Sequence, residues 1–330
     1  ILGLKSDYKY TCIGDVHKQL RYSSIMFMTD QDLDGSHIKA LCLNFFNSQW
    51  RELFEMEGFI GYMNTPIIKA TKGSTVKQFY NENAYHEWKK THNKGKGWKI
   101  KYYKGLGTST ANEFKEYMAN KKVISVNCQD EEDLDSIDKV FNKTRADDRK
   151  EWLGKYDKDR RLDTTKNSVL VREFIDGEMI HFSKYDCERS IANLMDGFKT
   201  SQRKIIYTCF KRKLVKEVKV AQLAGSVSEI SEYHHGEMSL VGAIIKLAQE
   251  YVGSNNLNPL YPGGQFGTRL EGGSDAASPR YIRTMLNKIT RCVYPEADDK
   301  VLNYLDEDGV FVEPEYYLPI IPMILVNGGK

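Results

Sequence analysis

The segment that most constrains this fold is MTDQDLDGSH, residues 28–37, in which three aspartates stand at alternate positions. It follows a short apolar run at residues 25–28, which is typical of a buried strand. Apolar residues then recur at helical spacing, namely Ile38, Leu41, Cys42, Phe45 and Phe46. Ser36 is placed to cap that helix. The segment therefore predicts a strand, an acidic loop and a helix, in that order.

The acidic loop matches the first half of a calcium-binding EF-hand loop, D-x-D-x-D-G, from Asp30 to Gly35. That loop requires a glutamate at its twelfth position, where this chain has Leu41, and it follows a helix rather than a strand. Magnesium fits better, because it keeps its waters and needs only one or two carboxylates and a substrate phosphate. A solvated acidic turn with no bound metal remains the alternative.

Further strands are predicted in the first part of the chain, at residues 59–63, 67–70, 76–80 and 98–103, the last as an edge strand. The glycine-containing run at residues 104–109 resembles a phosphate-binding loop, although it lacks the G-x-x-x-x-G-K-[ST] spacing. A tight turn in which Thr108 or Ser109 caps a helix ending at Asn120 is the other interpretation. The acidic stretch at residues 129–138 is expected on the surface or at a domain boundary.

Composition is that of an ordinary globular protein, with 41% hydrophobic and 28% charged residues. Six dispersed cysteines without a C-x-x-C pair argue against structural zinc and favour a reducing compartment. No apolar run reaches the length of a membrane span. The first and last residues lead us to expect a piece of a longer protein.

The net charge is only +3, but lysines and arginines cluster at residues 199–219, opposed there by Glu217 alone. Such a stripe is typical of a phosphate-binding surface, and a solvated helix face is the alternative. Helices are predicted at residues 137–156, 188–195, 201–214 and 237–251. In the third, a core stripe is expected, formed by Ile205, Ile206, Cys209 and Phe210. The basic residues Arg203, Lys204, Lys211 and Arg212 are expected on its outer face, as in a DNA-reading helix.

A long run without hydrophobic periodicity spans residues 258–280 and is rich in glycine and proline. Long loops of this kind inside compact domains are often functional. Ser278 and Pro279 read as the N-cap and first residue of a helix that follows. Tyr281 would then lie at the start of that helix, between Arg280 and Arg283.

Several segments resemble the DNA breakage–reunion core of eukaryotic type II DNA topoisomerases. They are MTDQDLDGSH, KYYKGLGTS, ADDRKEWL, DGFKTSQRK, VKVAQLAGSVSE, YHHGE, GSNNLNPLYPGGQFGTR, GGSDAASPRYI and EPEYYLPIIPMILVNG. The resemblance implies an α/β TOPRIM fold (Rossmann-like, with a mostly parallel sheet), then a mainly α winged-helix domain and the start of an α/β tower domain. The implied boundaries are 1–132 for TOPRIM, 133–181 for a helical linker, 182–321 for the winged helix and 322–330 for the tower.

The resemblance also implies an activity and its partners. A homodimer would cleave both strands of one double-stranded DNA, pass a second duplex through and reseal the break. Such an enzyme relaxes, decatenates and unknots DNA in the nucleus, with Mg²⁺ at its cleavage site. ATP would drive the cycle from a domain that lies outside this sequence. No membrane is implied.

The implied catalytic residues are Tyr281, Arg280 and His235. A tyrosine can break DNA reversibly by transesterification, because the phosphotyrosyl link keeps the bond energy. Its phenol is a weak nucleophile unless positive charge stabilises the phenolate, and both Arg280 and a helix N-terminus could supply that charge. His235 matches the position that hydrogen-bonds the scissile phosphate. The metal site of one subunit would meet the tyrosine of the other.

The resemblance assigns the metal to Asp30 and Asp32, with Asp34 shared or in an outer position. It assigns DNA contacts to six basic residues: Lys104, Arg149, Lys150, Lys199, Arg203 and Lys204. The family's metal-binding glutamate is expected before Ile1, and its DNA-bending isoleucine after Lys330, so we expect the isolated fragment to be impaired. A TOPRIM nuclease or primase relative, which would not need Tyr281, and a non-enzymatic DNA-binding module are the competing hypotheses.

Overall fold

The structure is a computed structural model that describes residues 1–103, 105–307 and 310–329. The chain divides into two compact units, unit 1 (Ile1–Tyr185) and unit 2 (Asp186–Lys330), with the boundary inside helix α9 (Ile180–Ser190). Among the described residues, no helix has both the length and the apolar character that crossing a bilayer requires.

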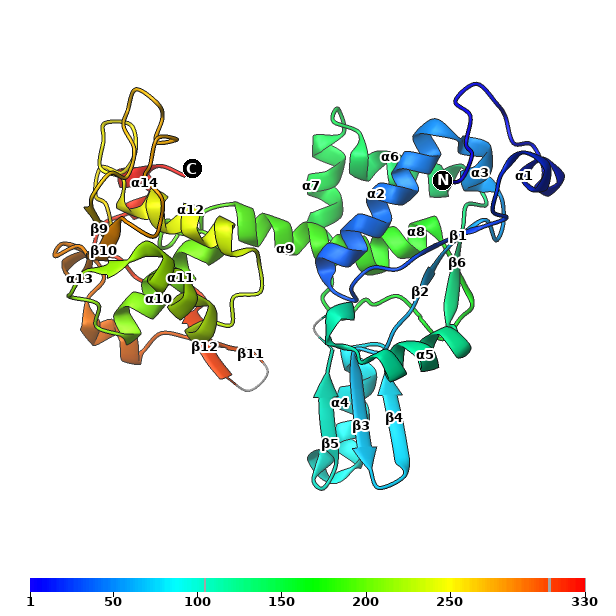
Figure 1. Ribbon diagram of the computed structural model, residues 1–330, viewed down its shortest axis with the longest axis horizontal. Coiled ribbons are helices and arrows are strands. Elements are labelled where there is room, and N and C mark those ends of the chain that lie inside the picture. The colour runs from blue at the N-terminus through cyan, green and yellow to red at the C-terminus, as the bar shows by residue number, and fades with distance from the viewer. Residues whose placement is uncertain (104, 308–309, 330) are drawn as a thin grey trace. The chain divides into compact units, whose positions relative to one another are not determined.

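Unit 1 alternates helices and strands along the chain (Figure 1). Before α9 its elements are α1 (Ile13–Gln19), β1 (Ile25–Phe27), α2 (Leu33–Gln49), α3 (Arg51–Glu55), β2 (Ile60–Met63), β3 (Ile68–Lys72), β4 (Thr75–Phe79), α4 (Glu82–Thr91), η1 (Asn93–Gly95), β5 (Lys99–Tyr102), η2 (Leu106–Thr108), α5 (Ala111–Ala119), β6 (Val123–Asn127), α6 (Glu131–Phe141), α7 (Ala146–Gly154), β7 (Ser168–Leu170), α8 (Val171–Phe174) and the π-helix η3 (Ile175–Met179).

The main sheet of unit 1 has the strand order β1-β2-β6-β7. β1 pairs with β2 in parallel and β6 with β7 in parallel, whereas β2 and β6 are antiparallel. This confirms the prediction of a mostly parallel sheet in an α/β fold. Residues 133–181, predicted as a linker, instead supply β7 and the helices α6 to α8 to this unit. Their side chains Ile137 and Phe174 are fully buried in the same core as Tyr62 of β2.

Helix α2 turns a different face to the core from the one predicted. Ile38, Leu41 and Phe45 are about half exposed, whereas Leu43 and Phe46 are buried. The helix also begins earlier than predicted, because Asp32 rather than Ser36 is its N-cap. Apolar residues lie on more than one face of this helix, so periodicity could not select the face that packs on the sheet.

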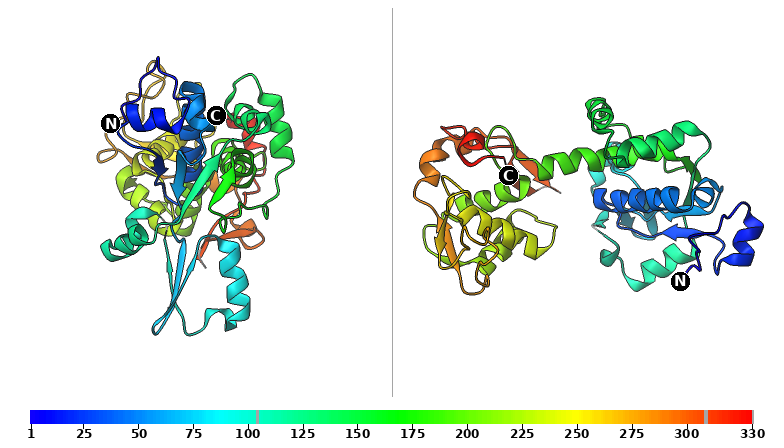
Figure 2. Two further views of the ribbon diagram at one scale, coloured as in Figure 1. Left: turned by 90° about the vertical axis from the view of Figure 1, so that its right-hand side faces the viewer. Right: turned by 90° about the horizontal axis from the view of Figure 1, so that it is seen from above.

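A second, antiparallel sheet with the order β4-β3-β5 forms a separate lobe of unit 1 with α4 beside it (Figures 1 and 2). Its small core contains Phe79, Tyr85 and Trp88. β5 lies at the edge of this sheet, as its alternating lysines predict. The following helix α5 ends before Asn120 as predicted, but Thr110 is its N-cap rather than Thr108 or Ser109.

The charged helix predicted at residues 137–156 is two helices, α6 and α7, separated by a turn at Asn142. The side chain of Asn142 accepts a hydrogen bond from the backbone N–H of Thr144, which competes with helical geometry. Helix α9 likewise ends at Ser190, so the helix predicted at residues 188–195 is wrong beyond that residue.

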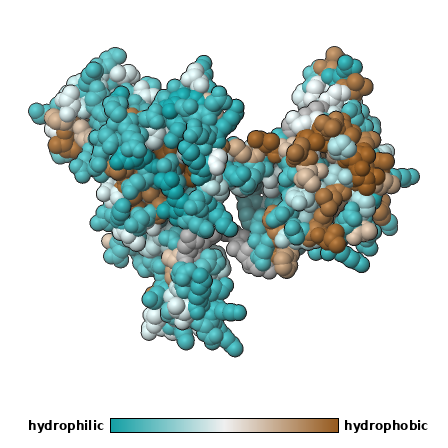
Figure 3. Space-filling view, turned by 180° about the vertical axis from the view of Figure 1, so that it is seen from behind, coloured by the Kyte–Doolittle hydropathy of each residue, from teal (hydrophilic) through white to brown (hydrophobic). Residues whose placement is uncertain are grey.

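Unit 2 contains the elements α10 (Thr200–Lys211), β8 (Val218–Lys219), α11 (Val220–Ile230), α12 (Glu237–Ala248), β9 (Leu260–Gly263), β10 (Arg283–Leu286), α13 (Thr290–Val293), η4 (Glu296–Lys300), β11 (Tyr304–Glu307), β12 (Val310–Pro314) and α14 (Met323–Asn327). Helices α10, α11 and α12 pack around Ile205, Leu223 and Ile244, all fully buried. One face of this unit carries grouped hydrophobic residues on its surface (Figure 3, brown).

An antiparallel sheet of order β8-β10-β9 accompanies the three helices, so unit 2 has the helix–strand–helix–helix–strand–strand order of a winged helix. We call the loop between β9 and β10, residues 264–282, the wing. Met323 packs in the core of this unit. The start of a tower domain at residue 322 stays a prediction.

The helix predicted to start at Ser278 is wrong. Residues 278–281 form a turn, and Arg283–Leu286 is strand β10. The apolar residues after Tyr281 fit both the helical period of 3.6 and the strand period of 2, because so few positions are involved. The stretch forms a strand because β10 pairs with β8 on one side and with β9 on the other. Tyr281 therefore does not begin a helix of its own. The helix N-terminus beside it is that of α11, whose first residues Val220 and Ala221 donate to the carbonyls of Ile282 and Pro279.

Candidate active site

The acidic loop connects β1 to α2, as its sequence predicts. Asp32 caps α2 by accepting a hydrogen bond from the Gly35 N–H, with 2.6 Å between Oδ1 and N. Asp34 lies in the first turn of α2. Both Asp30 and Asp32 are exposed. The carboxyl end of a strand and the start of a helix thus place two carboxylates at the surface of unit 1.

The glycine-containing loop lies against this acidic loop. The N–H of Leu106 donates to Asp30 Oδ1 at 2.6 Å. A Cβ added at Gly105 would lie 3.1 Å from the same oxygen, so a glycine suits this close approach. The loop therefore positions the Asp30 carboxylate and is not a turn independent of the acidic loop. Lys104, predicted to contact DNA, lies outside the described residues.

The acidic loop offers a small set of donors to a metal ion. Within the described ranges, no three or more His, Cys, Asp and Glu side chains come together as a metal site. Asp30 and Asp32 each use one carboxylate oxygen in a backbone hydrogen bond. Two exposed carboxylates fit Mg²⁺, which completes its shell with water and a substrate phosphate. They do not fit an ion that needs an all-protein cage.

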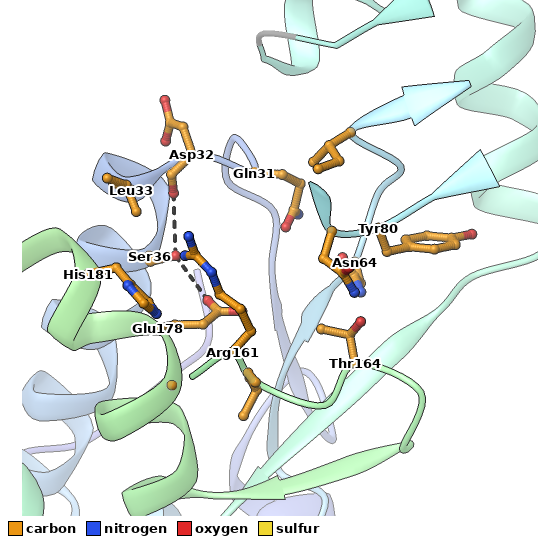
Figure 4. Close-up of a pocket in the computed structure, with 14 residues that line it drawn as sticks. Gln31, Asp32, Leu33, Ser36, Asn64, Tyr80, Arg161, Thr164, Glu178 and His181 are labelled. Atoms are coloured by element: carbon orange, nitrogen blue, oxygen red, sulfur yellow. Dashed lines mark hydrogen bonds between the residues drawn. The ribbon is translucent and has the colours of Figure 1, made fainter. Parts of the chain in front are cut away.

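A pocket of about 400 Å³ lies next to the acidic loop (Figure 4). Ser36 and Glu178 meet there, with 2.9 Å between Ser36 Oγ and Glu178 Oε2, and Arg161 lies beside them. The Asp32 carboxylate points away from this pair, and its backbone carbonyl accepts from Ser36 Oγ instead. The pocket is therefore distinct from the side of the loop that offers carboxylates.

Sequence reasoning missed the ion pair between the buried Lys39 and the partly buried Glu178, in which Nζ and Oε2 are 3.0 Å apart. The pair joins α2, directly after the acidic loop, to the π-helix η3. Lys39 also lies 4.4 Å from the centre of the Tyr62 ring. A lysine in the first turns of a helix is ordinary, and its partner is 139 residues away, so no local signal marks the pair.

Tyr281 lies at the end of the wing with 75% of its surface exposed. The Arg280 guanidinium carbon is 5.9 Å from the centre of the Tyr281 ring, which places positive charge beside the phenol. The backbone on both sides is fixed: Ala221 N–H donates to Pro279 O, and Val220 N–H donates to Ile282 O. An exposed phenol on a fixed backbone, next to an arginine, can reach a bound phosphate.

His235 lies in the turn between α11 and α12, which is the turn of the helix-turn-helix in unit 2. Its ring packs against that of Tyr233, with 5.4 Å between the ring centres. The neighbouring His234 approaches Glu307 of β11, with 3.9 Å between Nε2 and Oε2. The turn is thus held by contacts to its own residues and to the β11–β12 hairpin.

The prediction that Arg203 and Lys204 lie on the outer face of their helix is wrong. Arg203 Nε donates to Asp196 Oδ2 at 2.7 Å, and both side chains are buried. Lys204 Nζ donates to Ser231 O at 2.6 Å and to Glu313 Oε2 at 2.9 Å. Burial raises the pKa of Glu313 above its usual range, and Lys204 opposes that rise.

The other predicted DNA contacts are accessible to different degrees. Lys199 is half-buried and forms the N-cap of α10. Lys150 is exposed, with an ion pair to Asp147. Arg149 donates to the carbonyls of Lys139 and Asn142, so it holds the turn between α6 and α7. Lys211 and Arg212 are exposed at the end of α10, as predicted.

Comparison with known families gives two adjoining matches. The family described as the C-terminal associated domain of TOPRIM matches residues 63–187. The family that comprises the A-type subunit of DNA gyrase/topoisomerase IV matches residues 189–330. The two matches meet within a few residues of the boundary between unit 1 and unit 2.

Similar proteins extend over the whole chain. DNA topoisomerase 2-beta of Homo sapiens is 51% identical over 344 residues, covering 100% of this chain and 21% of that protein. DNA topoisomerase 2 of Arabidopsis thaliana is 49% identical, covering 100% of this chain and 22% of that protein. The chain therefore spans about a fifth of the length of these relatives. The crystal structure of the Plasmodium falciparum topoisomerase II DNA-binding, cleavage and re-ligation domain matches with a TM-score of 0.83 and 49% identity, covering 99% of this chain and 44% of that one.

Proposed function

This chain belongs to the type II DNA topoisomerase family, and from that premise we propose that it forms the DNA-cleaving part of an enzyme that changes DNA topology. The observation that carries the proposal is the exposed Tyr281 beside Arg280, at the end of a wing on a winged helix. A packing role would bury most of a tyrosine ring, whereas three quarters of this residue is exposed.

In the proposed reaction the Tyr281 oxygen attacks a DNA phosphorus. The P–O3′ bond breaks, a 5′-phosphotyrosyl link forms, and the 3′ oxygen leaves as a hydroxyl that takes up the proton lost by the phenol. Religation is the reverse attack by that hydroxyl, so no bond energy is lost. Arg280 stabilises the negative charge that builds on the phosphate, and His235 donates a hydrogen bond to it.

Asp30 and Asp32 would hold Mg²⁺, with Asp34 in a shared or outer position. A bound cation supplies charge stabilisation at the leaving 3′ oxygen and anchors a neighbouring phosphate. The protein's own contribution is the hydrogen bonds from Leu106 and Gly35, which fix the directions of the two carboxylates. Because Asp32 also caps α2, its orientation is set before any cation arrives.

The DNA partner is proposed to be a duplex held mainly through its phosphates. Lys199 and Lys150 remain candidates for direct contacts, as do Lys104 and the accessible part of Arg149. Arg203 and Lys204 act on DNA only through the elements they hold, since their charges are already paired in the interior.

The complete enzyme is proposed to be a nuclear homodimer driven by ATP bound outside this sequence. In it the tyrosine of one subunit works with the carboxylates of the other. The grouped hydrophobic residues on one face of unit 2 support an interface there, since large exposed apolar patches commonly mark protein contacts (Figure 3).

The test is a covalent-adduct assay on the full-length protein with supercoiled DNA and Mg²⁺, stopped with detergent. We expect protein attached to 5′ DNA ends, and we expect Tyr281→Phe to abolish the adduct while DNA binding persists. Free ends without adduct would identify a nuclease. Intact DNA would identify a binding module, and either result rejects the proposal.

A further inference from the structure

The wing that carries Tyr281 has few buried apolar side chains. Among its residues, all of which the structure describes, only Phe266 and Ile282 are buried. A loop of this length without a hydrophobic anchor in its middle would sample many conformations. Packing at Phe266 and Ile282 therefore leaves much of the chain between them to be fixed by other contacts.

A single buried amide joins the two legs of the wing. Gln249 follows the last residue of α12 and is 6% exposed. Its Nε2 donates to Phe266 O on the outgoing leg at 2.8 Å and to Gly273 O on the returning leg at 3.3 Å. Both hydrogens of the amide are thus used, one on each leg.

The chain is shaped to fit this amide. Gly273 has a φ of +83°, and a Cβ there would overlap Gln249 Nε2 and lie 2.6 Å from the Tyr251 hydroxyl oxygen. A Cβ at Gly267 would lie 2.6 Å from the Gly273 Cα, so the two legs approach each other closely at this level. Glycines at these two positions let the backbone reach the buried amide.

The hydrogen bonds continue from this point towards Tyr281. Thr268 N–H and Oγ1 both donate to the Asp275 carboxylate, at 2.8 and 2.9 Å. Ala277 N–H donates to Gln265 O at 2.9 Å. The next fixed points are the bonds from α11 to Pro279 and Ile282 on either side of Tyr281. The wing is therefore held at its base by α11 and across its legs by Gln249.

We propose that Gln249 is a positioning residue for Tyr281, which fixes the wing so that the phenol and Arg280 meet the DNA phosphate in a reactive geometry. The inference rests on the proposed role of Tyr281. Gln249 itself touches no reacting atom. A misplacement of a reacting group by about 1 Å is enough to cost roughly 100-fold in rate.

Gln249→Glu tests this in the full-length enzyme, because it keeps the size of the side chain and places a carboxylate oxygen against two carbonyls. Gln249→Met, which removes the amide without adding charge, and Gly273→Ala, which displaces it, are the second and third variants. Gln129→Glu, at an exposed position in unit 1, controls for charge. Cys209→Ala, in the buried stripe of α10, controls for loss of stability in unit 2.

We expect all three wing variants to form the covalent adduct about 100-fold more slowly at saturating DNA, with the dissociation constant for DNA within about twofold of wild type. Amide hydrogen exchange at Thr268, Gly273 and Ala277 should accelerate about tenfold or more in the same variants. The two controls should change neither measurement, even where Cys209→Ala lowers the melting temperature.

An unchanged adduct rate in Gln249→Glu and Gln249→Met overturns the inference, as does an unchanged exchange rate in the wing. A loss of DNA affinity that matches the loss of adduct also overturns it, because Gln249 would then serve binding. Adduct formation by Tyr281→Phe would instead reject the proposed function, and the exchange measurement would still report whether Gln249 holds the wing.

Discussion

Lys204 and Glu313, 109 residues apart in the chain, form a buried ion pair with 2.9 Å between Nζ and Oε2. The same ammonium group donates to the carbonyl of Ser231 at the end of α11 and to Glu307. One side chain thus ties helix α10, the turn that leads to His235 and the β11–β12 hairpin together.

Removing the charge of Lys204 should destabilise unit 2 rather than release a DNA phosphate. Lys204→Met leaves the buried Glu313 carboxylate without its partner, which typically costs about 3–5 kcal/mol. We expect a loss of that size in the free energy of unfolding, measured by chemical denaturation. Lys204→Met combined with Glu313→Leu should recover much of it, because the double variant leaves no uncompensated charge.

The salt dependence of DNA binding should separate the basic residues of α10 into two groups. Lys199→Ala should lower the slope of log affinity against log salt by about 0.9, the value for one phosphate contact. Arg203→Met, by contrast, should leave the slope unchanged, because its guanidinium is paired with Asp196. Binding isotherms at four or five salt concentrations measure both. Equal slopes for Lys199→Ala and wild type would remove Lys199 from the DNA surface.

Asp32→Asn should separate the two roles of this residue. Asparagine caps helices about as well as aspartate, so the melting temperature without metal should stay close to that of wild type. The amide is a poor ligand for Mg²⁺, and the Mg²⁺ concentration for half-maximal adduct formation should rise about 10- to 100-fold. Stabilisation of the protein by Mg²⁺ should weaken in parallel. Asp32→Ala, which also removes the cap, should in addition lose about 1 kcal/mol of stability.

Stability should depend on acid pH through Glu113, which lies in the first turn of α5. Burial raises the pKa of this carboxyl, but hydrogen bonds from Lys101, Thr110 and Tyr103 lower it more, to about 2. Since the folded-state pKa lies below the ordinary 4.5, the stabilisation is present above pH 4.5 and is lost as the pH falls towards 2.

The measurement is the free energy of unfolding of wild type and Glu113→Gln between pH 7 and pH 3. We expect the variant to be less stable by about 2 kcal/mol at neutral pH, and this difference should shrink as the solution becomes more acidic. Glu87→Gln, in an exposed i,i+3 pair with Lys90, is the matched control and should change little at any pH. A difference in stability between wild type and Glu113→Gln that grows as the pH falls would contradict the lowered pKa of Glu113.

Short local signals predicted the strand, acidic loop and helix well, because that motif depends on residues close in the chain, whereas the winged helix was predicted from the family resemblance. The strand β1, the loop and the helix α2 follow from spacing within 25 residues, and the family resemblance supplied the rest. The helix prediction at Tyr281 was wrong because the residues after it fit both the helical and the strand period. Pairing with β8 and β9 makes them a strand. Those partner strands are distant in sequence, so the local pattern cannot predict the pairing.

The basic residues show the same limit for side chains. Arg203 and Lys204 read as an outer face because a lysine–arginine pair is usually solvated. Their buried partners, Asp196 and Glu313, have nothing in their own surroundings that marks them. The contact between Asp30 and the glycine-containing loop, 76 residues apart, was equally hidden. Sequence reasoning therefore proposed the segments of the candidate site but not the contacts that orient their side chains.

Asp196 has a consequence for how this protein is made. Its fully buried carboxylate accepts hydrogen bonds from Arg203 and from the backbone N–H of Tyr317, which the ribosome adds 121 residues later. A nascent chain that has emerged only as far as the wing can shape its helices, but this acidic group still lacks one of its donors. The last donor to Asp196 therefore becomes available only late in translation, after Tyr281 has already been synthesised.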